Sequence, residues 1–378
     1  MSELTEYQRI IKDQIKKVLE KRLTPIVATL DEEERELPFE IWDLFQEMGL
    51  LTHVIPARYG GTEDSSLTTL CIILEEVSKV CLSSGLSCLS SALLQLAILK
   101  GGTEGQREHY FQRILKRRTI LAICVTEPGC GSDAAAIKTK AEKIGSKYKI
   151  NGTKTFITNG SIADLYFTWA VTDTRKKARG ISCFIVERGT PGLRVGKKEK
   201  KMGLRASPTT EVIYDDALIP GEDLLGCIEG TGFKVLMEIF DITRIAMGAL
   251  AVGLSQAAID FAINYCKIRV SFGKPLIEHQ GMAFLLAEMS TLNEAARALV
   301  YNTREQYDRG ENMIKLASMV KYFTAQSTMR ITTDAVQCLG GYGYVRDFPV
   351  ERYMRDAKIL EIFEGTSQIQ KLIIAREL

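Results

Sequence analysis

The sequence contains few of the residues from which metal sites and disulfide frameworks are built. Its 378 residues include only three histidines, which lie far apart at His53, His109 and His279 and form no HExxH pair. The nine cysteines are an odd number and include no CxxC pair. A zinc hydrolase, a zinc ribbon and a disulfide-stapled fold are therefore poor interpretations. We predict no metal site, and the cysteines fit a reducing compartment.

An excess of charge of one sign is also lacking. Lys and Arg total 49 and Asp and Glu total 47, so the formal net charge is +2. This balance lacks the basic footprint of a nucleic-acid-binding protein, and we expect no nucleic-acid partner. Hydrophobic residues make up 46% and charged residues 25% of the chain, which is typical of globular proteins rather than disordered or fibrous ones. The length predicts two or three domains.

An apolar leader is absent from the start of the sequence. Charged residues run through the first 21 positions, so we expect no secretory signal and a cytoplasmic protein. One uncharged stretch, residues 80–99, has about the length that spans a bilayer. It contains five serines, Gly85 and Gln95, and we interpret it as a buried helix with small residues at its contacts. We therefore expect no integral membrane segment.

The order of helical and extended patterns predicts an α+β protein in three parts. Helical spacing dominates residues 1–118, where Thr103 and Gln106 form a capping box. Residues 119–228 hold short β-rich runs broken by Gly, Asn and Pro, and helical spacing returns in 229–378. We expect an N-terminal α-helical domain, a middle β-barrel or sandwich domain and a C-terminal four-helix bundle. Strands and helices do not alternate, which argues against a Rossmann sheet.

Within the middle domain, the pair Asn151-Gly152 predicts a hairpin turn. It separates the β-rich runs KYKI and TKTFIT. A two-residue type I′ turn needs positive φ at both central residues, and Asn-Gly meets that need best. We expect the two runs to form the two strands of one hairpin.

Three segments carry candidate chemistry. The Gly, Pro and Ser residues of 126–133 (TEPGCGSD) would let a ligand approach the backbone, although a plain surface turn is the alternative. In 156–160 (FITNG), Phe156 and Thr158 point to one strand face, either to stack a flat ligand or to form an ordinary cross-strand pair. Glu364 lies between apolar residues and a glycine. It is either a general base or an acidic residue favoured by a helix start.

Five segments, in this order and spacing, resemble the flavin-dependent acyl-CoA dehydrogenases: TEPGCGSD, KTFITNG, RVSFGKP, QCLGGYG and IFEGTSQIQ. The similarity covers essentially the whole chain. It implies the acyl-CoA dehydrogenase fold, FAD as cofactor, an acyl-CoA substrate and an electron-transferring flavoprotein as the electron acceptor. It also implies a homotetramer built as a dimer of dimers.

The resemblance assigns roles to residues of this chain. It implies that Thr158 hydrogen-bonds near flavin N5 and that Phe156 replaces the family's usual stacking tryptophan. Arg269 and Phe272 match residues that reach the pyrophosphate and adenine end of FAD in a neighbouring subunit. The implied FAD-binding set is Val125, Thr126, Gly131, Ser132, Phe156, Thr158, Arg269, Phe272, Gln337, Gly340, Gly341, Thr366 and Gln368. The implied substrate-binding set is Ser132, Leu86, Leu89, Phe240, Asp241, Arg244, Phe363, Gly365 and Arg376.

The resemblance makes Glu364 the catalytic base, which takes the α-proton of the thioester while the β-hydride goes to flavin N5. We expect Ile362 and Phe363 to desolvate Glu364 and raise its pKa. The backbone N–H of Glu364 and a flavin ribityl hydroxyl are implied as donors to the thioester oxygen. Some relatives carry their base where this chain has Thr243, and Arg244 remains available near the active site.

The uncharged run 80–99 limits the substrate. Relatives that act on glutaryl-CoA carry an arginine there, and this chain does not. A buried carboxylate without a partner is costly, so we expect an uncharged acyl tail. Two other functions would keep the fold: an acyl-CoA oxidase that uses O2, and a non-catalytic FAD-binding assembly protein. Release of peroxide during turnover identifies the first, and failure of every acyl-CoA to reduce the flavin identifies the second.

Overall fold

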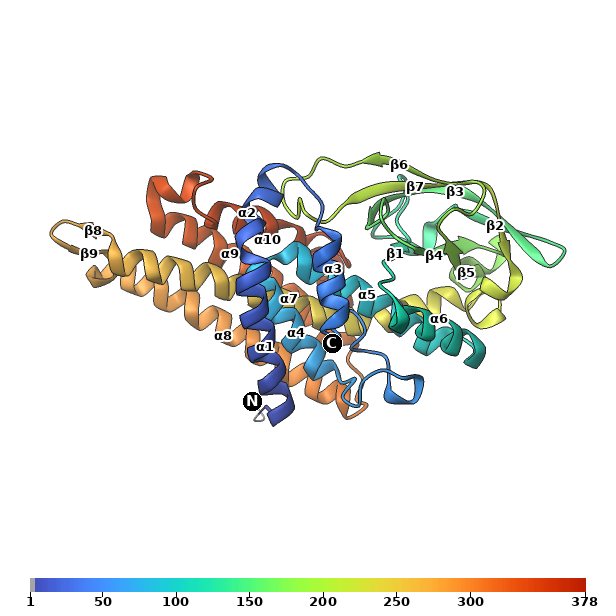
Figure 1. The fold of residues 1–378 in the computed structure, drawn as a ribbon, viewed down its shortest axis with the longest axis horizontal. Helices are drawn as coiled ribbons and strands as arrows, with labels where there is room; N and C mark the ends of the chain where they lie inside the picture. Colours follow the sequence, from blue (N-terminus) through green and yellow to red (C-terminus); the bar gives the residue numbers. More distant parts are fainter. Residues whose placement is uncertain (1–3) are drawn as a thin grey trace.

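The structure, a computed structural model, describes residues 4–378. Helices, a curled β-sheet and a second set of helices follow one another along the chain (Figure 1). This confirms the predicted α+β architecture. The N-terminal helices are α1 (Glu6–Arg22), α2 (Thr24–Glu32), α3 (Phe39–Glu47), α4 (Leu67–Val80), α5 (Leu82–Gly101) and α6 (Glu104–Lys116).

Helix α5 is a core helix. Among the described residues it is the one helix long and apolar enough to cross a membrane, and 89% of that apolar window is buried inside the fold. Ser87 and Ser91 each donate to the carbonyl oxygen four residues earlier, at 3.2 Å, so their hydroxyls are satisfied within the helix. The next helix, α6, begins at the predicted capping box of Thr103 and Gln106.

The middle part is a seven-stranded sheet in the order β1-β4-β2-β3-β7-β6, with β5 paired to β4. Strand β4 is parallel to β1 and β2, and the remaining pairs are antiparallel. The strands are β1 (Leu121–Cys124), β2 (Lys140–Ile144), β3 (Lys147–Thr158), β4 (Leu165–Val171), β5 (Ile181–Glu187), β6 (Leu193–Lys198) and β7 (Thr209–Pro220).

The predicted hairpin turn at Asn151-Gly152 is wrong. The pairing of Ile144 with Lys147 places the β2–β3 turn at the two residues between them, and Asn151-Gly152 lies inside β3. There the register with β7 shifts, and the Asn151 side chain exchanges two 2.8 Å hydrogen bonds with Asp216 on β7. The glycine is needed because a Cβ at Gly152 would lie 2.4 Å from a threonine hydroxyl on the neighbouring segment. The Asn-Gly pair therefore serves a bulge rather than a turn.

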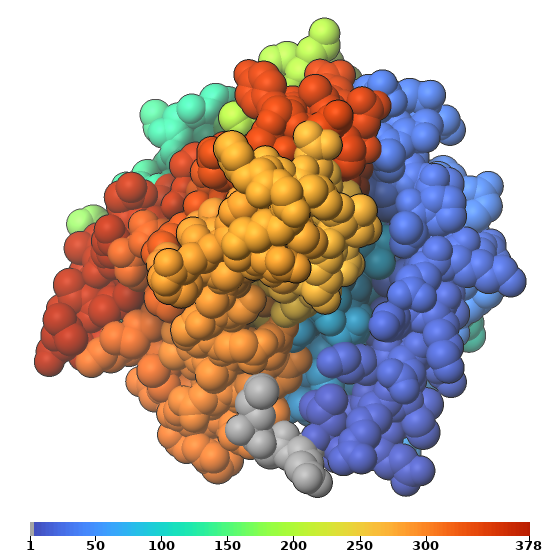
Figure 2. All heavy atoms as spheres, turned by 90° about the vertical axis from the view of Figure 1, so that its left-hand side faces the viewer, coloured from blue at the N-terminus to red at the C-terminus, as the bar shows by residue number. Residues whose placement is uncertain are grey.

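The C-terminal part is a helical bundle in which α7, α8 and α9 pack against one another and α11 packs on α9. A short hairpin, β8–β9, projects from the end of this bundle opposite the β-sheet (Figure 1). Figure 2 looks onto that end. The elements are α7 (Gly232–Ile268), β8 (Val270–Ser271), β9 (Lys274–Pro275), α8 (Gln280–Asp308), α9 (Ile314–Leu339), α10 (Val350–Ala357) and α11 (Ser367–Arg376).

A glycine allows the N-terminal and C-terminal helices to meet closely. Gly253 on α7 faces α4, where an added Cβ would lie 2.1 Å from Ser78 Oγ and 2.2 Å from the carbonyl oxygen of Glu75. Both of those residues are buried. A larger side chain at this position must therefore push the two helices apart.

We expect Gly253→Ala to lower the free energy of unfolding by about 1–3 kcal/mol, the usual cost of overpacking a core. The matched control is Gly105→Ala in α6, where an added Cβ would meet no atom within 4 Å. That change is expected to be neutral or to stabilise by up to about 1 kcal/mol. Thermal unfolding of both variants checks the prediction, and equal midpoints would contradict it.

Candidate active site

A buried ion pair holds the start of the loop 126–133 against β3. Lys154 on β3 is fully buried, and its Nζ lies 2.9 Å from the carbonyl oxygen of Val125 and 2.9 Å from Glu127 Oε1. Glu127 also accepts the backbone N–H groups of Lys138 at 2.6 Å and Thr139 at 2.9 Å. Burial raises the pKa of Glu127, but Lys154 and these hydrogen bonds outweigh it and bring the pKa below its ordinary value.

This anchoring places two predicted FAD-binding segments side by side. The backbone N–H of Thr155 donates to the carbonyl oxygen of Thr126 at 2.9 Å, so Val125 and Thr126 lie beside Phe156 and the strand end that carries Thr158. Phe156 has a positive φ of 57°, and its side chain is 65% exposed. It pairs with no other ring among the described residues.

An exposed aromatic ring beside an open loop fits a flat aromatic ligand. Two further predicted residues, Gly131 and Ser132, are exposed on the same loop. An added Cβ at Gly131 would meet only Thr126, at 3.9 Å, so the space next to the backbone is open. The residues at this end of β3 and on the neighbouring loop therefore fit a flavin ring.

The predicted base lies on a strained turn just before α11. Glu364 and Gly365 have φ values of 53° and 88°, so two consecutive residues adopt the left-handed conformation. The Thr243 hydroxyl on α7 lies 3.2 Å from each of two acceptors, Glu364 Oε2 and the carbonyl oxygen of Phe240, and it orients the carboxylate toward α7. The Gln370 side-chain amide donates to the carbonyl oxygens of Glu364 at 3.3 Å and Gly365 at 3.0 Å.

The pKa of Glu364 is raised, as predicted. Burial is the largest cause, and the Thr243 hydrogen bond and the positive charges of Lys321 and Arg244 oppose it. Of the two adjacent residues expected to desolvate Glu364, Phe363 is half-buried and Ile362 is 50% exposed, and their contribution stays a prediction. The turn also contacts α7 through Thr243 and α9 through Lys321.

Arg244 is buried on α7 near the base. Its Nη1 donates to Asp241 Oδ1 at 2.7 Å, while its buried Nε has no hydrogen-bond partner among residues 4–378. Burial lowers the pKa of Arg244, and the charges of Asp241 and Glu364 oppose this effect. A buried guanidinium nitrogen without a partner is uncommon, and this N–H could donate a hydrogen bond to an acceptor atom of a bound ligand.

A second group of predicted FAD-binding residues lies at the far end of the bundle. Phe272 is 96% exposed at the tip of the β8–β9 hairpin. The Arg269 guanidinium lies 5.7 Å from the centroid of the Tyr342 ring, which brings it to the segment that carries Gly340 and Gly341. In Figure 2 the gold hairpin region and the neighbouring orange-red segment share the exposed end of the molecule.

The structure does not bring this group close to Phe156 and the loop 126–133. The hairpin and the β-sheet lie at opposite ends of the chain's fold (Figure 1). Gln337, which closes α9 together with Gly340, is exposed at the same end as the hairpin. A single copy of the chain therefore holds the two halves of the predicted FAD site far apart.

The remaining predicted residues are spread over three elements. Leu86 and Leu89 are buried on α5, and Phe240 and Asp241 are half-buried on α7. Phe363, directly before Glu364, is half-buried. After Glu364, the Thr366 hydroxyl caps α11, and Gln368 and Arg376 on that helix are exposed.

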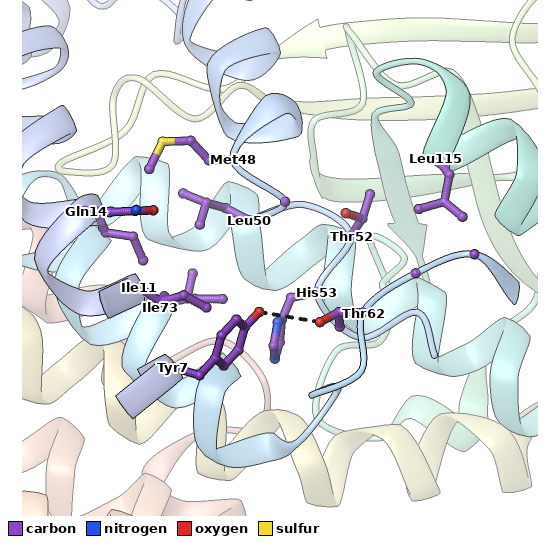
Figure 3. A pocket seen from close by; sticks show the side chains of 14 residues that line it. Tyr7, Ile11, Gln14, Met48, Leu50, Thr52, His53, Thr62, Ile73 and Leu115 are labelled. Atoms are coloured by element: carbon purple, nitrogen blue, oxygen red, sulfur yellow. Dashed lines mark hydrogen bonds between the residues drawn. The ribbon is translucent and has the colours of Figure 1, made fainter. Parts of the chain in front are cut away.

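Two cavities of the structure lie away from the Glu364 turn. One of about 290 Å³ opens in the N-terminal helices between Tyr7 and Thr62, whose hydroxyls lie 3.5 Å apart, and contains His53 (Figure 3). None of its lining residues belongs to the predicted sets. Another of about 290 Å³ borders the loop 126–133 and is lined in part by Glu127.

Sequence reasoning missed four residues that shape the site: Glu127, Lys154, Lys321 and Gln370. One of them left a signal. Lys321 stands on the buried face of α9 together with Ala317, Thr324 and Thr328, and a lysine at helical spacing within such a face is unusual. The other three lie within the segments TEPGCGSD, KTFITNG and IFEGTSQIQ, but those segments do not show which partners the three side chains have.

The chain matches three sequence models of one family: "Acyl-CoA dehydrogenase, N-terminal domain" over residues 5–118, "middle domain" over 122–217 and "C-terminal domain" over 230–378. It is 44% identical over 374 residues to cyclohexane-1-carbonyl-CoA dehydrogenase of Syntrophus aciditrophicus (strain SB), covering 99% of this chain and 97% of that protein.

Two solved structures superpose closely. Butyryl-CoA dehydrogenase from Megasphaera elsdenii is 37% identical, with a TM-score of 0.96 and coverage of 100% of this chain and 99% of that one. A chain in a structure reported for the electron transferring flavoprotein of Acidaminococcus fermentans is 40% identical, with the same TM-score and coverage. The chain therefore belongs to the acyl-CoA dehydrogenase family, whose members are flavoprotein oxidoreductases that dehydrogenate acyl-CoA thioesters.

Proposed function

We propose that this protein converts an acyl-CoA to the 2-enoyl-CoA with FAD as cofactor and Glu364 as the base that removes the α-proton. The observation that carries the proposal is the half-buried Glu364 carboxylate, which accepts a hydrogen bond from Thr243 and whose pKa is raised by desolvation. A thioester α-proton is weakly acidic, and a general base works best when its pKa lies near the working pH. The family membership supports the reaction class.

Residues that follow β1 and residues at the end of β3 would hold the flavin ring. Val125, Thr126 and Thr158 would offer backbone and hydroxyl groups to its polar edge, and the exposed Phe156 would stack against its face. Gly131 and Ser132 would complete this set from the loop, and Thr366 and Gln368 from the start of α11. When bound, FAD supplies the acceptor for the hydride that leaves the β-carbon.

The chain's own groups would manage the proton and the thioester oxygen. Glu364 would accept the α-proton on its carboxylate, which Thr243 holds in one orientation. The backbone N–H of Glu364 donates to no carbonyl among the described residues, so it is available to the thioester oxygen as negative charge develops there. Gly365, Phe363 and Arg244 would line the substrate side of the same turn.

A second copy of the chain would complete each FAD site. The exposed Arg269 and Phe272, with Gln337, Gly340 and Gly341, lie at the end of the bundle opposite the Phe156 face, so they serve a neighbouring subunit in this proposal. Arginine can hold a phosphate with its planar fork. A dimer is the minimum assembly, and the homotetramer is the assembly we propose.

We propose an electron-transferring flavoprotein as the acceptor of the electrons. The similarity to a chain in a structure reported for such a flavoprotein supports this partner. An acyl-CoA oxidase would behave differently. Its turnover would stop without oxygen, would release hydrogen peroxide in air and would not become faster when electron-transferring flavoprotein is added.

We expect an uncharged acyl tail to be preferred strongly over a charged one. Helix α5, which carries the proposed tail-binding residues Leu86 and Leu89, has no charged side chain before Lys100 in its last turn. The test compares kcat/KM for cyclohexane-1-carbonyl-CoA, butyryl-CoA and glutaryl-CoA. Glutaryl-CoA is expected to be slower than the better of the other two by a factor of about 100 or more, because its buried carboxylate would lack a partner. Comparable values for all three would contradict the proposed pocket.

A further inference from the structure

A lysine is buried directly beneath the Glu364 turn. Lys321 on α9 is 1% exposed, and its Nζ donates to the carbonyl oxygen of Gly365 at 2.6 Å. Burial lowers the pKa of Lys321 to about 8, which the charge of Glu364 partly opposes. Placing a lysine among the buried residues of a helix carries a desolvation cost, so its retention there calls for a specific role.

The turn needs such support. A residue with a side chain in the left-handed conformation carries strain of about 1–3 kcal/mol, and Glu364 adopts it immediately before Gly365. Two neutral hydrogen bonds from the fully buried Gln370 hold the two carbonyl oxygens from the α11 side. The ammonium of Lys321 adds a charge-assisted bond from the α9 side, and such bonds are the stronger kind.

The charges around Glu364 come from three elements. Helix α9 contributes Lys321, and α7 contributes Arg244, which is itself paired with Asp241. The 3-10 turn before the base contributes Glu361, whose charge acts on Lys321. Gln370 on α11 is neutral. Lys321 is therefore one of two cations that act on the carboxylate, and it is the one whose ammonium bonds the turn itself.

We infer that Lys321 is a positioning residue for Glu364: its hydrogen bond fixes the strained turn, and its charge favours the ionised form of the carboxylate. The inference rests on the proposed role of Glu364 as the base. Lys321 touches neither the substrate nor the reacting atoms in this proposal. It acts through the backbone and through the electrostatic field of the turn.

Three substitutions separate the two effects. Lys321→Gln removes the charge and keeps an amide donor, Lys321→Met removes both, and Lys321→Arg keeps the charge. The measurement is the rate of flavin reduction by a saturating acyl-CoA without oxygen, as a function of pH. Glu364 must be ionised to act, so a higher pKa moves the rise in rate to higher pH. Lys321→Gln and Lys321→Met are expected to move that rise upward by about one pH unit, and Lys321→Arg to leave it near its original place.

The hydrogen bond is tested by the plateau of the same profiles. Lys321→Met is expected to lower the plateau rate about tenfold or more relative to Lys321→Gln, because a misplaced base loses reactivity steeply. Lys315→Gln, on the same helix, is the matched control and should leave the profile unchanged. Lys315 is half-buried and belongs to neither predicted set.

An unshifted rise in Lys321→Gln with normal FAD content would overturn the inference. If all three Lys321 variants lose FAD and folded structure alike, the lysine has a purely structural role and the inference is also overturned. Failure of the proposed function looks different. It would appear as normal flavin reduction in a Glu364→Gln variant, whatever the Lys321 variants do.

Discussion

Replacing Glu364 by glutamine is expected to slow flavin reduction by acyl-CoA by a factor of at least about 10² to 10⁴, the usual contribution of general acid–base catalysis. An amide cannot accept the α-proton at neutral pH. It has nearly the same shape as the carboxylate, so the hydroxyl of Thr243 can still donate to its oxygen, and the turn and the FAD site should persist. Stopped-flow absorbance of the bound flavin, mixed with saturating acyl-CoA without oxygen, gives the rate directly.

The matched control is Glu361→Gln, three residues earlier. Glu361 is half-buried and pairs with Lys358 at 2.6 Å, an ion pair whose lysine is 49% exposed. Such pairs contribute about 0–1 kcal/mol, so this variant should keep a rate close to that of the unchanged protein. A Glu364→Gln protein with full FAD content and an undiminished rate would remove Glu364 from the mechanism.

Replacing Lys154 by methionine is expected to destabilise the sheet and weaken FAD binding together. The change leaves the Glu127 carboxylate buried without its cation, and breaking one side of a buried pair costs about 3–5 kcal/mol. It also removes the bond to the Val125 carbonyl that holds the loop beside Phe156. We expect the dissociation constant of FAD to rise about tenfold or more, since loosening a preorganised site costs affinity. Denaturant unfolding and flavin fluorescence titration measure the two effects.

A matched control and a double variant show whether the loss comes from the buried ion pair. Lys149→Met changes the same residue type on the same strand, where the ion pair with Asp216 is exposed, so its effect should be below about 1 kcal/mol. Adding Glu127→Gln to Lys154→Met removes the unpaired charge and should recover part of the lost stability. If the single Lys154→Met variant is as stable as Lys149→Met, the buried pair does not anchor the loop.

The sequence predicted the helices and the buried strands well, because both bury apolar side chains at a regular spacing. Strands β2 and β6 escaped prediction because most of their residues are exposed, and their runs KAEKI and LRVGKK carry little apolar alternation. The Asn151-Gly152 pair misled the prediction of the hairpin. A close neighbour on another segment, rather than a turn, requires that glycine.

Part of the candidate site could likewise be predicted from the sequence, and part could not. The loop 126–133 and the segment with Phe156 and Thr158 were predicted from local motifs, and a hydrogen bond between them brings the two segments together. The Lys154–Glu127 pair was not predicted, because 27 positions separate its members and charged residues are usually exposed. The raised pKa of Glu364 was expected, but the three residues that oppose the shift, Thr243, Lys321 and Arg244, come from α7 and α9, far from Glu364 in the sequence.

The central claim is that an acyl-CoA delivers electrons to FAD held by this protein, with Glu364 taking the proton. The most direct test is an anaerobic titration of the purified holoprotein with cyclohexane-1-carbonyl-CoA and butyryl-CoA, followed by the visible absorption of the flavin. The account predicts bleaching of the flavin and a long-wavelength charge-transfer band with at least one of them. A yellow protein that retains its FAD and is unchanged by every saturated acyl-CoA would contradict it.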